Sequence, residues 1–260
     1  MIILSSNKIV FNVDILLYVL PEGVKRNSLI IIAGEGGAGK SVLLANIAKS
    51  VITEGEPLLY LTLDDDPATI VEQLKSYNTD VETAFREQRF GIIDGFSYLI
   101  KGKKGRAHPM VIDEVNPNDI ESVVYSLIKN VDSFKMNNTG VLIIDSLNEI
   151  MITLDPTRII EFVKTIRANI AKHRGVATIA SLHTSTEDFL SYLLNIEHLV
   201  DGIIELGSLK ERELGKLEIS LRQILVRKMK GVPHKAVWTL FTIDKEGVKP
   251  VVLKSSKNKF

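Results

Sequence analysis

The sequence predicts an α/β protein with a mostly parallel central sheet flanked by helices and an antiparallel C-terminal β extension. Three observations predict this fold. Short, wholly apolar runs alternate with segments of helical periodicity up to about residue 182. A glycine-rich loop joins the first apolar run to the first helical segment, and strand-like runs follow one another after residue 182. Wholly apolar runs are typical of strands buried on both faces, as in parallel sheets.

The alternating region begins at a run rich in isoleucine. Strands are expected at residues 28–33, 58–63, 90–94, 140–145 and 176–182. Helices are expected at residues 42–52, 67–77, 119–131 and 156–174, where apolar residues recur at helical spacing. Pro67 favours a helix start, because its missing N–H is not needed in the first turn. Residues 97–117, which contain several basic residues and two prolines, are predicted to form a loop.

The C-terminal region has a different pattern. Strand-like runs at residues 203–206, 217–226, 237–243 and 248–253 have no helical segments between them, which favours an antiparallel arrangement. Residues 1–27 are expected to lead into the core, and residues 254–260 to form a frayed basic tail. The chain has one glycine-rich loop and no internal repeat, so residues 1–260 are predicted to form a single domain.

Composition excludes several classes of protein. The 260 residues include 32 Lys+Arg and 32 Asp+Glu, so the formal net charge is zero and a uniformly basic nucleic-acid-binding surface is excluded. A hydrophobic content of 45% with 25% charged residues is typical of globular rather than disordered chains. The absence of cysteine excludes disulfides, a cysteine zinc site and a thiol nucleophile. Because no apolar run reaches roughly 18 residues and no signal-peptide pattern is present, a cytoplasmic protein without membrane insertion is expected.

The charge is unevenly distributed along the chain. Residues 222–260 contain ten Lys and Arg residues against Asp244 and Glu246, a net charge of +8, so the preceding 221 residues carry −8. A basic C-terminal region on an acidic body favours head-to-tail contact between subunits, or one local anion-binding face.

The glycine-rich loop follows the pattern Gly34-x-x-x-x-Gly39-Lys40-Ser41. The backbone N–H groups of such a loop, together with the N-terminus of the next helix, can bind phosphate. Lys40 is expected to reach the β- and γ-phosphates, and the Ser41 hydroxyl to ligate Mg²⁺. The candidate ATP-binding residues are Gly34, Glu35, Gly36, Gly37, Ala38, Gly39, Lys40, Ser41 and Val42.

Acidic residues at the ends of two of the expected strands are candidates for the functional site. Asp145 follows an apolar run at residues 141–144, and its carboxylate is expected at the ligand-binding edge of the sheet, holding Mg²⁺ directly or through water. Asp64 and Asp65 end an earlier strand and are candidates for the base or water-orienting group of hydrolysis. The alternative for this acidic run is a helix N-terminal cap, and for Asp66 the two interpretations have equal weight.

The order of these motifs resembles that of the RecA superfamily and, within it, the single-domain KaiC-like ATPases of archaea, often described as RadA paralogues. The resemblance covers roughly residues 10–250. It is carried by an acidic strand end before proline, an Asp-Gly-Phe-Ser segment, the strand ending in Asp145, an Asp-Gly strand and a late Lys-Met-x-Gly segment, at residues 61–67, 92–97, 143–147, 198–206 and 226–234. The resemblance implies a RecA-like P-loop NTPase core that binds ATP and Mg²⁺.

The resemblance also implies roles for individual residues. Asp64 and Asp65 stand where the family has catalytic glutamates, although aspartate is shorter by one methylene group. His183 lies at the position of the γ-phosphate sensor. Lys228 and Lys230 match cations that reach the γ-phosphate of a neighbouring subunit, although Lys230 replaces an arginine and lacks its bidentate fork. The alternatives are a polar strand end for the histidine and a solvated edge strand for the two lysines.

The function implied by the resemblance is Mg²⁺-dependent ATP hydrolysis at sites between the subunits of a homo-oligomer, such as a hexameric ring. An accessory or regulatory role in DNA recombination or repair is expected, with a recombinase or repair protein as partner. Two alternatives stay open. One is a nucleotide-gated scaffold that hardly hydrolyses ATP, which the shorter aspartates and Lys230 motivate; the other is a KaiC-like regulatory ATPase of the archaellum motor.

A basic cluster in the predicted loop at residues 97–117 is the candidate contact for single-stranded DNA. A basic cluster can track phosphates, with a solvated loop as the alternative; it consists of Lys101, Lys103, Lys104 and Arg106. Residues 184–193, in the place of a second DNA-binding loop of recombinases, contain no Lys or Arg. This composition argues against RecA-like DNA pairing, as does the lack of a separate helical DNA-binding domain before the core.

Overall fold

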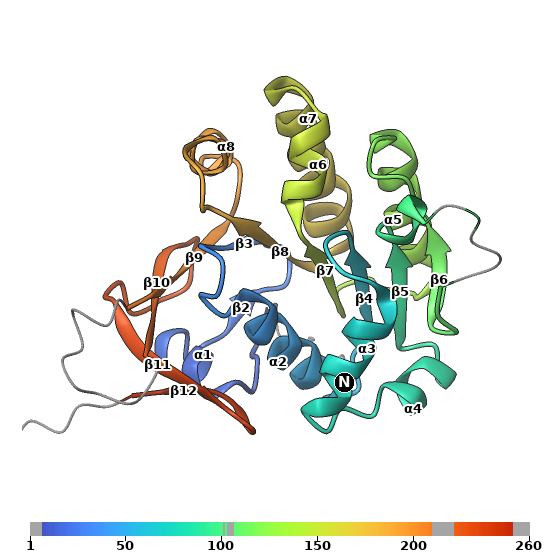
Figure 1. Ribbon diagram of the computed structural model, residues 1–260. Helices are drawn as coiled ribbons and strands as arrows, with labels where there is room; N and C mark the ends of the chain where they lie inside the picture. The colour runs from blue at the N-terminus through green and yellow to red at the C-terminus, as the bar shows by residue number, and fades with distance from the viewer. Residues whose placement is uncertain (1–6, 101, 103–106, 210–220, 252–260) are drawn as a thin grey trace, which may run out of the picture.

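The chain forms one large sheet with helices on both faces (Figure 1). The computed structural model describes residues 7–100, 102, 107–209 and 221–251. The ten-stranded sheet has the order β12-β11-β10-β9-β3-β8-β7-β4-β5-β6. A separate two-stranded sheet pairs β1 (Lys8–Ile9) with β2 (Val24–Lys25), and helix α1 (Asp14–Val19) lies between them in the sequence.

The strands from β9 to β6 in this order run parallel. Their bounds are β3 (Leu29–Gly34), β4 (Leu58–Thr62), β5 (Phe90–Asp94), β6 (Val111–Glu114), β7 (Val141–Asp145), β8 (Ala177–His183) and β9 (Gly202–Ser208). Alternate residues of β3 enter two cores, with Ile30 and Ile32 on one face and Leu29 and Ile31 on the other. Burial on both faces explains why β3 is continuously apolar.

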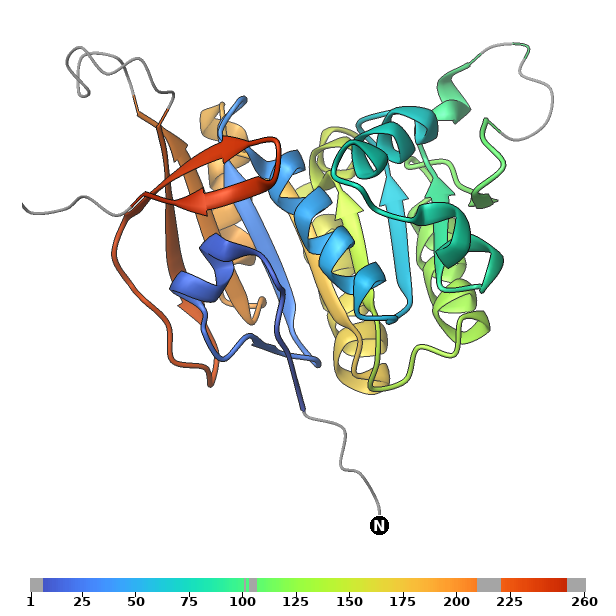
Figure 2. The same ribbon diagram turned by 90° about the horizontal axis from the view of Figure 1, so that it is seen from below.

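Each face of the sheet has its own layer of helices (Figures 1 and 2). One layer contains α2 (Lys40–Thr53), α3 (Pro67–Ser76) and α4 (Val81–Arg86). The other contains α5 (Ile120–Ser133), α7 (Pro156–Ile166), its π-helical continuation η2 (Arg167–Lys172) and α8 (Glu187–Ile196). Short helices η1 (Ser97–Leu99) and α6 (Leu147–Thr153) follow β5 and β7. None of the helices within the described ranges is long and apolar enough to cross a membrane.

The C-terminal part extends the sheet with antiparallel strands. These are β10 (Arg222–Met229), which pairs with β9, then β11 (Thr239–Asp244) and β12 (Gly247–Pro250). The β11–β12 hairpin lies against α2, as Figure 2 shows. The packing is close, because a Cβ atom added at Gly247 would lie 2.1 Å from Oδ1 of Asn46. The hairpin therefore reaches the helix that follows the glycine-rich loop.

The predicted fold class is confirmed: a mostly parallel sheet flanked by helices ends in antiparallel strands. The expectation for residues 97–117 is wrong in part, because this segment contains edge strand β6, whose acidic residues break the apolar pattern. Residues 203–206 pair parallel with β3 and belong to the parallel part. The short helices α4, α6 and α8 were not predicted, although Leu193 and Ile196 of α8 are buried at helical spacing.

Candidate functional site

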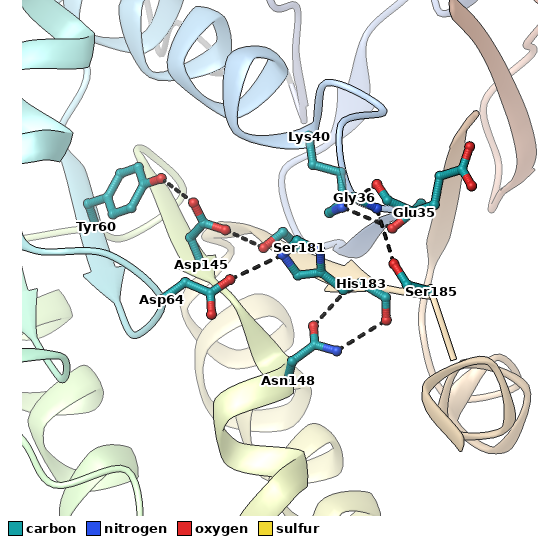
Figure 3. A network of polar contacts seen from close by, with 11 residues as sticks. Glu35, Gly36, Lys40, Tyr60, Asp64, Asp145, Asn148, Ser181, His183 and Ser185 are labelled. Carbon is teal, nitrogen blue, oxygen red and sulfur yellow. Dashed lines mark hydrogen bonds and ion pairs between the residues drawn. The ribbon is translucent and has the colours of Figure 1, made fainter. Parts of the chain in front are cut away.

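The carboxyl ends of β3, β8, β7 and β4 lie next to one another and bring the predicted motifs together (Figure 3). Gly34 at the end of β3 is paired with His183 at the end of β8. Thr62 at the end of β4 is paired with Asp145 at the end of β7, and Asp64 follows β4 closely. This edge of an open α/β sheet is the one at which ligands bind.

The loop between β3 and α2 has open space beside Gly36 and Gly37. Gly37 and Gly39 have φ angles of 78° and 101°, which glycine adopts without strain. A Cβ atom added at Gly36 or Gly37 would meet no described heavy atom within 4 Å. No described side chain caps the N-terminus of α2 at Gly39, whereas Asp66 and Asp119 cap α3 and α5. The first turn of α2 therefore does not lose its backbone donors to a side-chain cap, and these donors suit an anion.

Lys40 is buried and points back to the loop. Its Nζ donates to the carbonyl oxygens of Gly34 and Glu35, both at 2.9 Å. Burial lowers the pKa of Lys40, while the carboxylates of Asp145, Asp64 and Glu35 act in the opposite direction. The ammonium group therefore lies among carboxylates at the point where a phosphate chain would need a cation.

Two residues that the motifs did not identify contact the loop. Ser185, which precedes α8, accepts a hydrogen bond from the N–H of Gly36 at 3.1 Å. Arg222, the first residue of β10, donates from Nε to the carbonyl of Gly37 at 3.0 Å. The only signal for Arg222 in the sequence is its membership of the basic C-terminal region. Distant parts of the chain thus support the phosphate-binding loop.

The Asp145 carboxylate is buried and accepts two hydroxyl hydrogen bonds. Tyr60 Oη donates to Oδ2 at 2.8 Å, and Ser181 Oγ donates to Oδ1. Burial raises the pKa of Asp145, although both hydrogen bonds favour the ionised form. Burial also raises the pKa of Tyr60 well above its ordinary value, so this side chain stays a neutral donor. The two hydroxyls fix the orientation of the carboxylate at the end of β7.

The three consecutive aspartates have different contacts. Asp66 is the N-cap of α3, and its Oδ1 accepts two backbone hydrogen bonds at 2.9 and 3.2 Å, so the cap interpretation is correct for this residue. Asp65 is exposed and accepts the N–H of Asp66 at 2.9 Å. Asp64 turns to the site, with Oδ2 3.1 Å from Nε2 of His183. Of the two candidate bases, Asp64 is the one that contacts another site residue.

His183 is held through its backbone and contacts Asp64 through its ring. Its N–H donates to Oδ1 of Asn148 at 2.7 Å, and Nδ2 of Asn148 donates to its carbonyl at 3.1 Å. The side chain is 36% exposed, so the ring borders the open side of the site. The predicted sensor and the predicted base thus form one contact, while their catalytic roles stay predictions.

Lys228 and Lys230 lie at the opposite end of the sheet from the phosphate-binding loop of the same chain. Lys228 is paired with Ile203, close to the start of β9, whereas the loop follows the end of β3. Its Nζ donates to the carbonyl of Glu197 at 2.6 Å, and Nζ of Lys230 is 3.8 Å from Oδ1 of Asp201. The two lysines therefore do not serve the site of their own chain, and their action on a neighbouring subunit stays a prediction.

Two of the predicted features lie outside the residues that the structure describes. The basic cluster Lys101, Lys103, Lys104 and Arg106 lies outside the described residues, and so does the predicted tail at residues 254–260.

Most of residues 187–193 belong to the exposed side of helix α8, where Leu190 is 44% exposed. A helix with apolar side chains thus occupies the place considered for a second DNA-binding loop.

The residues at this edge fit a nucleoside triphosphate with Mg²⁺. The start of α2 and Lys40 provide N–H donors and a cation for phosphate oxygens. Ser41 is exposed beside Lys40, and Asp145 is close enough to Lys40 to influence its pKa. A hydroxyl and a carboxylate are oxygen ligands of the kind that Mg²⁺ prefers.

A mostly parallel sheet with a phosphate-binding loop, an acidic end of β7 and an antiparallel extension defines a RecA-like P-loop ATPase. The family model described as "ATPase: KaiC" matches residues 11–255. The chain therefore belongs to the KaiC ATPase family, as the resemblance in sequence predicted.

Several known proteins are similar to this chain. UPF0273 protein MJ1359 of Methanocaldococcus jannaschii is 27% identical over 234 residues, covering 88% of this chain and 90% of that protein. UPF0273 protein PF1931 of Pyrococcus furiosus is 23% identical over 231 residues, covering 88% of each. The crystal structure of KaiC-like protein PH0186 from Pyrococcus horikoshii OT3 matches with a TM-score of 0.72 and 20% identity, covering 94% of this chain and 99% of that one. This structural likeness supports the fold.

Proposed function

We propose that this protein binds ATP with Mg²⁺ and hydrolyses it slowly. The observation that carries the proposal is the convergence of Lys40, Asp145, Asp64 and His183 at one edge of the sheet, beside an open phosphate-binding loop. Mg²⁺, when bound, neutralises charge on the β- and γ-phosphates. The slow rate is expected because aspartate places its carboxylate less far from the backbone than glutamate does.

Each residue of the site has its own role in ATP binding or hydrolysis. Lys40 exchanges its two backbone carbonyl acceptors for phosphate oxygens. Ser41 and Asp145 hold the metal, with Asp145 oriented by its hydroxyl partners. Asp64 orients or deprotonates the attacking water, and His183 contacts the γ-phosphate from the neighbouring strand end.

We further propose that residues 1–260 act as one domain within a homo-oligomer whose sites lie between subunits, such as a hexameric ring. The placement of Lys228 and Lys230 away from their own loop supports this, because only a neighbouring chain could bring them to a phosphate. The net +8 of residues 222–260 against −8 for the rest supports head-to-tail association.

Replacement of the loop lysine tests nucleotide binding. Lys40→Ala is expected to abolish ATP binding measured by calorimetry, because phosphate loses its buried cation. The matched control is Lys49→Ala, on the same helix but away from its N-terminus. ATP affinity that is unchanged in Lys40→Ala would refute the proposed site.

The second candidate is a nucleotide-gated scaffold that binds ATP but does not turn it over. The substitution of aspartate for glutamate at residue 64 and of lysine for arginine at residue 230 favours it. Single-turnover phosphate release with protein in excess separates the two, since a scaffold gives tight binding and no release above the uncatalysed rate.

The proposed setting is an accessory role in DNA recombination or repair, supported by the resemblance to RadA paralogues; regulation of an archaellum motor is the alternative. Titration with single-stranded DNA at several salt concentrations tests the role in DNA recombination or repair. We expect a variant with four alanine substitutions to bind DNA more weakly and with a flatter salt dependence. The substituted residues are Lys101, Lys103, Lys104 and Arg106. Unchanged affinity and slope would remove this cluster as a DNA contact.

A further inference from the structure

A group of positively charged side chains lies at the end of the sheet opposite the phosphate-binding loop. Its centre is Asp201, which precedes β9 and accepts a hydrogen bond from the N–H of Leu29 at 3.1 Å. Leu29 begins β3, whereas the loop follows the other end of this strand, about 16 Å away at a rise of about 3.3 Å per residue. We propose that three cations beside Asp201 form a binding site for a terminal phosphate group. These cations are Arg167, Lys172 and Lys230.

In the proposed oligomer this phosphate is the γ-phosphate of ATP bound to a neighbouring subunit, and that assignment rests on the proposed function. The anion site itself rests on contacts within one chain. Arg167 and Lys172 are the two ends of η2, and no sequence motif identifies either of them. Lys230, in contrast, belongs to the late Lys-Met-x-Gly segment. The two residues of η2 therefore enlarge the group of cations that a neighbouring nucleotide would meet.

The three cations converge on one carboxylate oxygen. Nη2 of Arg167 lies 2.9 Å from Oδ1 of Asp201, and Nζ of Lys172 lies 3.1 Å from the same atom. Nζ of Lys230 is 3.8 Å from it. In the part of the chain that the structure describes, none of these cations forms an ion pair with another carboxylate. One negative charge therefore faces three positive charges, and a further anion would relieve the repulsion between them.

A fourth cation adds to the excess of positive charge. A Cβ atom added at Gly231, the residue after Lys230, would lie 2.3 Å from Nζ of Lys25. Counted with the three cations at Asp201, Lys25 brings the net formal charge of the group to +3. A terminal phosphate carries up to two negative charges and three acceptor oxygens, which suits such a group better than a single carboxylate does.

Arg167 keeps hydrogen-bond donors for a second anion. A guanidinium group has five N–H donors in a planar fork. Nε and Nη2 of Arg167 donate to Asp201 at 3.1 and 2.9 Å, which uses one edge of this fork. Nη1 makes no hydrogen bond to any described residue, so the edge formed by Nη1 and Nη2 remains available. Two parallel N–H groups on one edge match two oxygens of a phosphate.

The cations lie on the solvent side of the carboxylate. The Asp201 side chain is 3% exposed, whereas those of Arg167, Lys172 and Lys230 are 31%, 34% and 46% exposed. A phosphate from solvent therefore meets the cations before it meets Asp201. Lys172 is held by a second hydrogen bond, to the carbonyl of Asn27 at 2.6 Å. The Lys230 ammonium group, at 3.8 Å, is beyond hydrogen-bond distance from Asp201 and can turn to a phosphate without losing that contact.

Titration with inorganic tripolyphosphate tests the anion site without ATP or hydrolysis. The full-length chain carrying Lys40→Ala, whose own loop lacks its cation, is expected to bind tripolyphosphate in calorimetry. Adding Arg167→Lys is expected to weaken this binding about tenfold, because lysine keeps the charge but lacks the second edge of the fork. The control is Lys164→Ala, an exposed cation on α7 one turn before Arg167. No tripolyphosphate binding by the Lys40→Ala protein, or an equal affinity after Arg167→Lys, overturns the inference.

A double variant separates the guanidinium group from net charge and from folding. Arg167→Gln with Asp201→Asn removes one charge of each sign, so it leaves no unpaired carboxylate and does not change the net charge. This variant, in the Lys40→Ala background, is expected to bind tripolyphosphate about tenfold more weakly. An unchanged affinity would show that net charge alone attracts the anion, and would overturn the role of Arg167.

Nucleotide affinities identify the source of the phosphate. In the otherwise wild-type chain, Arg167→Lys is expected to weaken ATP binding about tenfold and to change ADP binding by less than about twofold, because only ATP has a γ-phosphate. Arg167 is too far from its own loop to act on its own nucleotide, so this selective loss requires a neighbouring subunit. Unchanged ATP affinity together with tripolyphosphate binding would overturn the assignment to a neighbour's nucleotide and identify a site for free polyphosphate. A wild type that does not bind ATP would defeat the proposed function, and the tripolyphosphate titration would still decide the anion site.

Discussion

His183 and Asp64 are 119 residues apart in the sequence, yet Nε2 of one lies 3.1 Å from Oδ2 of the other. They are held at the ends of β8 and β4, and β7 lies between these strands in the sheet. Their contact therefore passes over the end of the strand that carries Asp145. One histidine and two carboxylates thus share the sheet edge at which the phosphate-binding loop begins (Figure 3).

The contact predicts that the two candidate bases are unequal. Asp64→Asn is expected to lower the single-turnover rate of ATP hydrolysis by about 100-fold or more, because it removes the group that can orient or deprotonate water. Asp65→Asn, at an exposed position with a local backbone contact, is expected to change the rate by less than about threefold. Equal losses in the two variants, at equal ATP affinity, would contradict this assignment.

Asp66 predicts an effect on stability without one on catalysis. Its carboxylate caps α3 and also accepts from Oγ1 of Thr69 at 2.6 Å. Asp66→Ala is expected to lower the free energy of unfolding by about 1 kcal/mol, measured by urea denaturation, because the first-turn donors lose their acceptor. Asp65→Ala is the control and should have a smaller effect. A loss of ATP turnover in Asp66→Ala under conditions where this variant is fully folded would show that Asp66 has a second role.

The parallel core was predictable because burial on both faces leaves a direct record in the sequence. Strands β3, β4 and β7 are fully buried, and they are apolar except for Thr62 and Asp145 at the ends of β4 and β7. Edge strand β6 was missed because only its first residue is buried, and because Asp113 accepts hydrogen bonds from Ser126 and Asn130 instead of facing an apolar core. Helix α6 was missed because it is short and begins directly after the motif that ends in Asp145.

The site was predictable where one local motif carries the chemistry, and not where distant residues converge. Lys40 and Asp145 follow patterns readable within a few residues. Tyr60 and Ser181 orient Asp145 from two other strands, and nothing near them in the sequence marks that role. Arg222 likewise reaches the loop only through the order of strands in the sheet.

We expect Arg222 to contribute to ATP affinity, because it contacts the phosphate-binding loop. Its Nε bonds to the carbonyl of Gly37, and its side chain lies beside Gly39. Arg222→Ala is expected to weaken ATP binding about tenfold, which corresponds to about 1.4 kcal/mol, because the loop loses a support and a nearby positive charge. Lys245→Ala, an exposed residue in the same basic region, is the control. Equal affinities in calorimetry for Arg222→Ala and the wild type would contradict the role.

The Asp201 carboxylate predicts an acid-dependent contribution to stability. It is 3% exposed and accepts hydrogen bonds from Arg167 at 2.9 and 3.1 Å and from the N–H of Leu29 at 3.1 Å. Burial opposes ionisation, but these bonds and the Lys172 ammonium group lower the pKa of Asp201 below its ordinary value. A carboxylate with a lowered folded-state pKa stabilises the fold above the unfolded-state value of about 3.9 and loses this effect as pH falls through the folded-state value.

Asp201→Asn is therefore expected to lower the free energy of unfolding at pH 7 by about 3 kcal/mol, with a difference that shrinks below about pH 4. The control is Glu121→Gln, which removes an exposed ion pair with Arg158 and should cost less than about 1 kcal/mol. Urea denaturation across this pH range measures both. A difference for Asp201→Asn that stays constant with pH would contradict the assigned cause.

The orientation of Lys228 and Lys230 away from their own loop predicts complementation between subunits. A Lys40→Ala subunit loses its loop lysine but keeps Lys228 and Lys230, and a double-alanine variant at the latter two has the reverse defect. Mixing the two is expected to raise phosphate release above the sum of the separate rates, with a maximum near equal proportions, because some interfaces pair an intact loop with intact lysines. A mixture of Lys40→Ala with Asp64→Asn contains no intact loop side and should stay inactive. Strictly additive rates in the first mixture would place the two lysines outside the site.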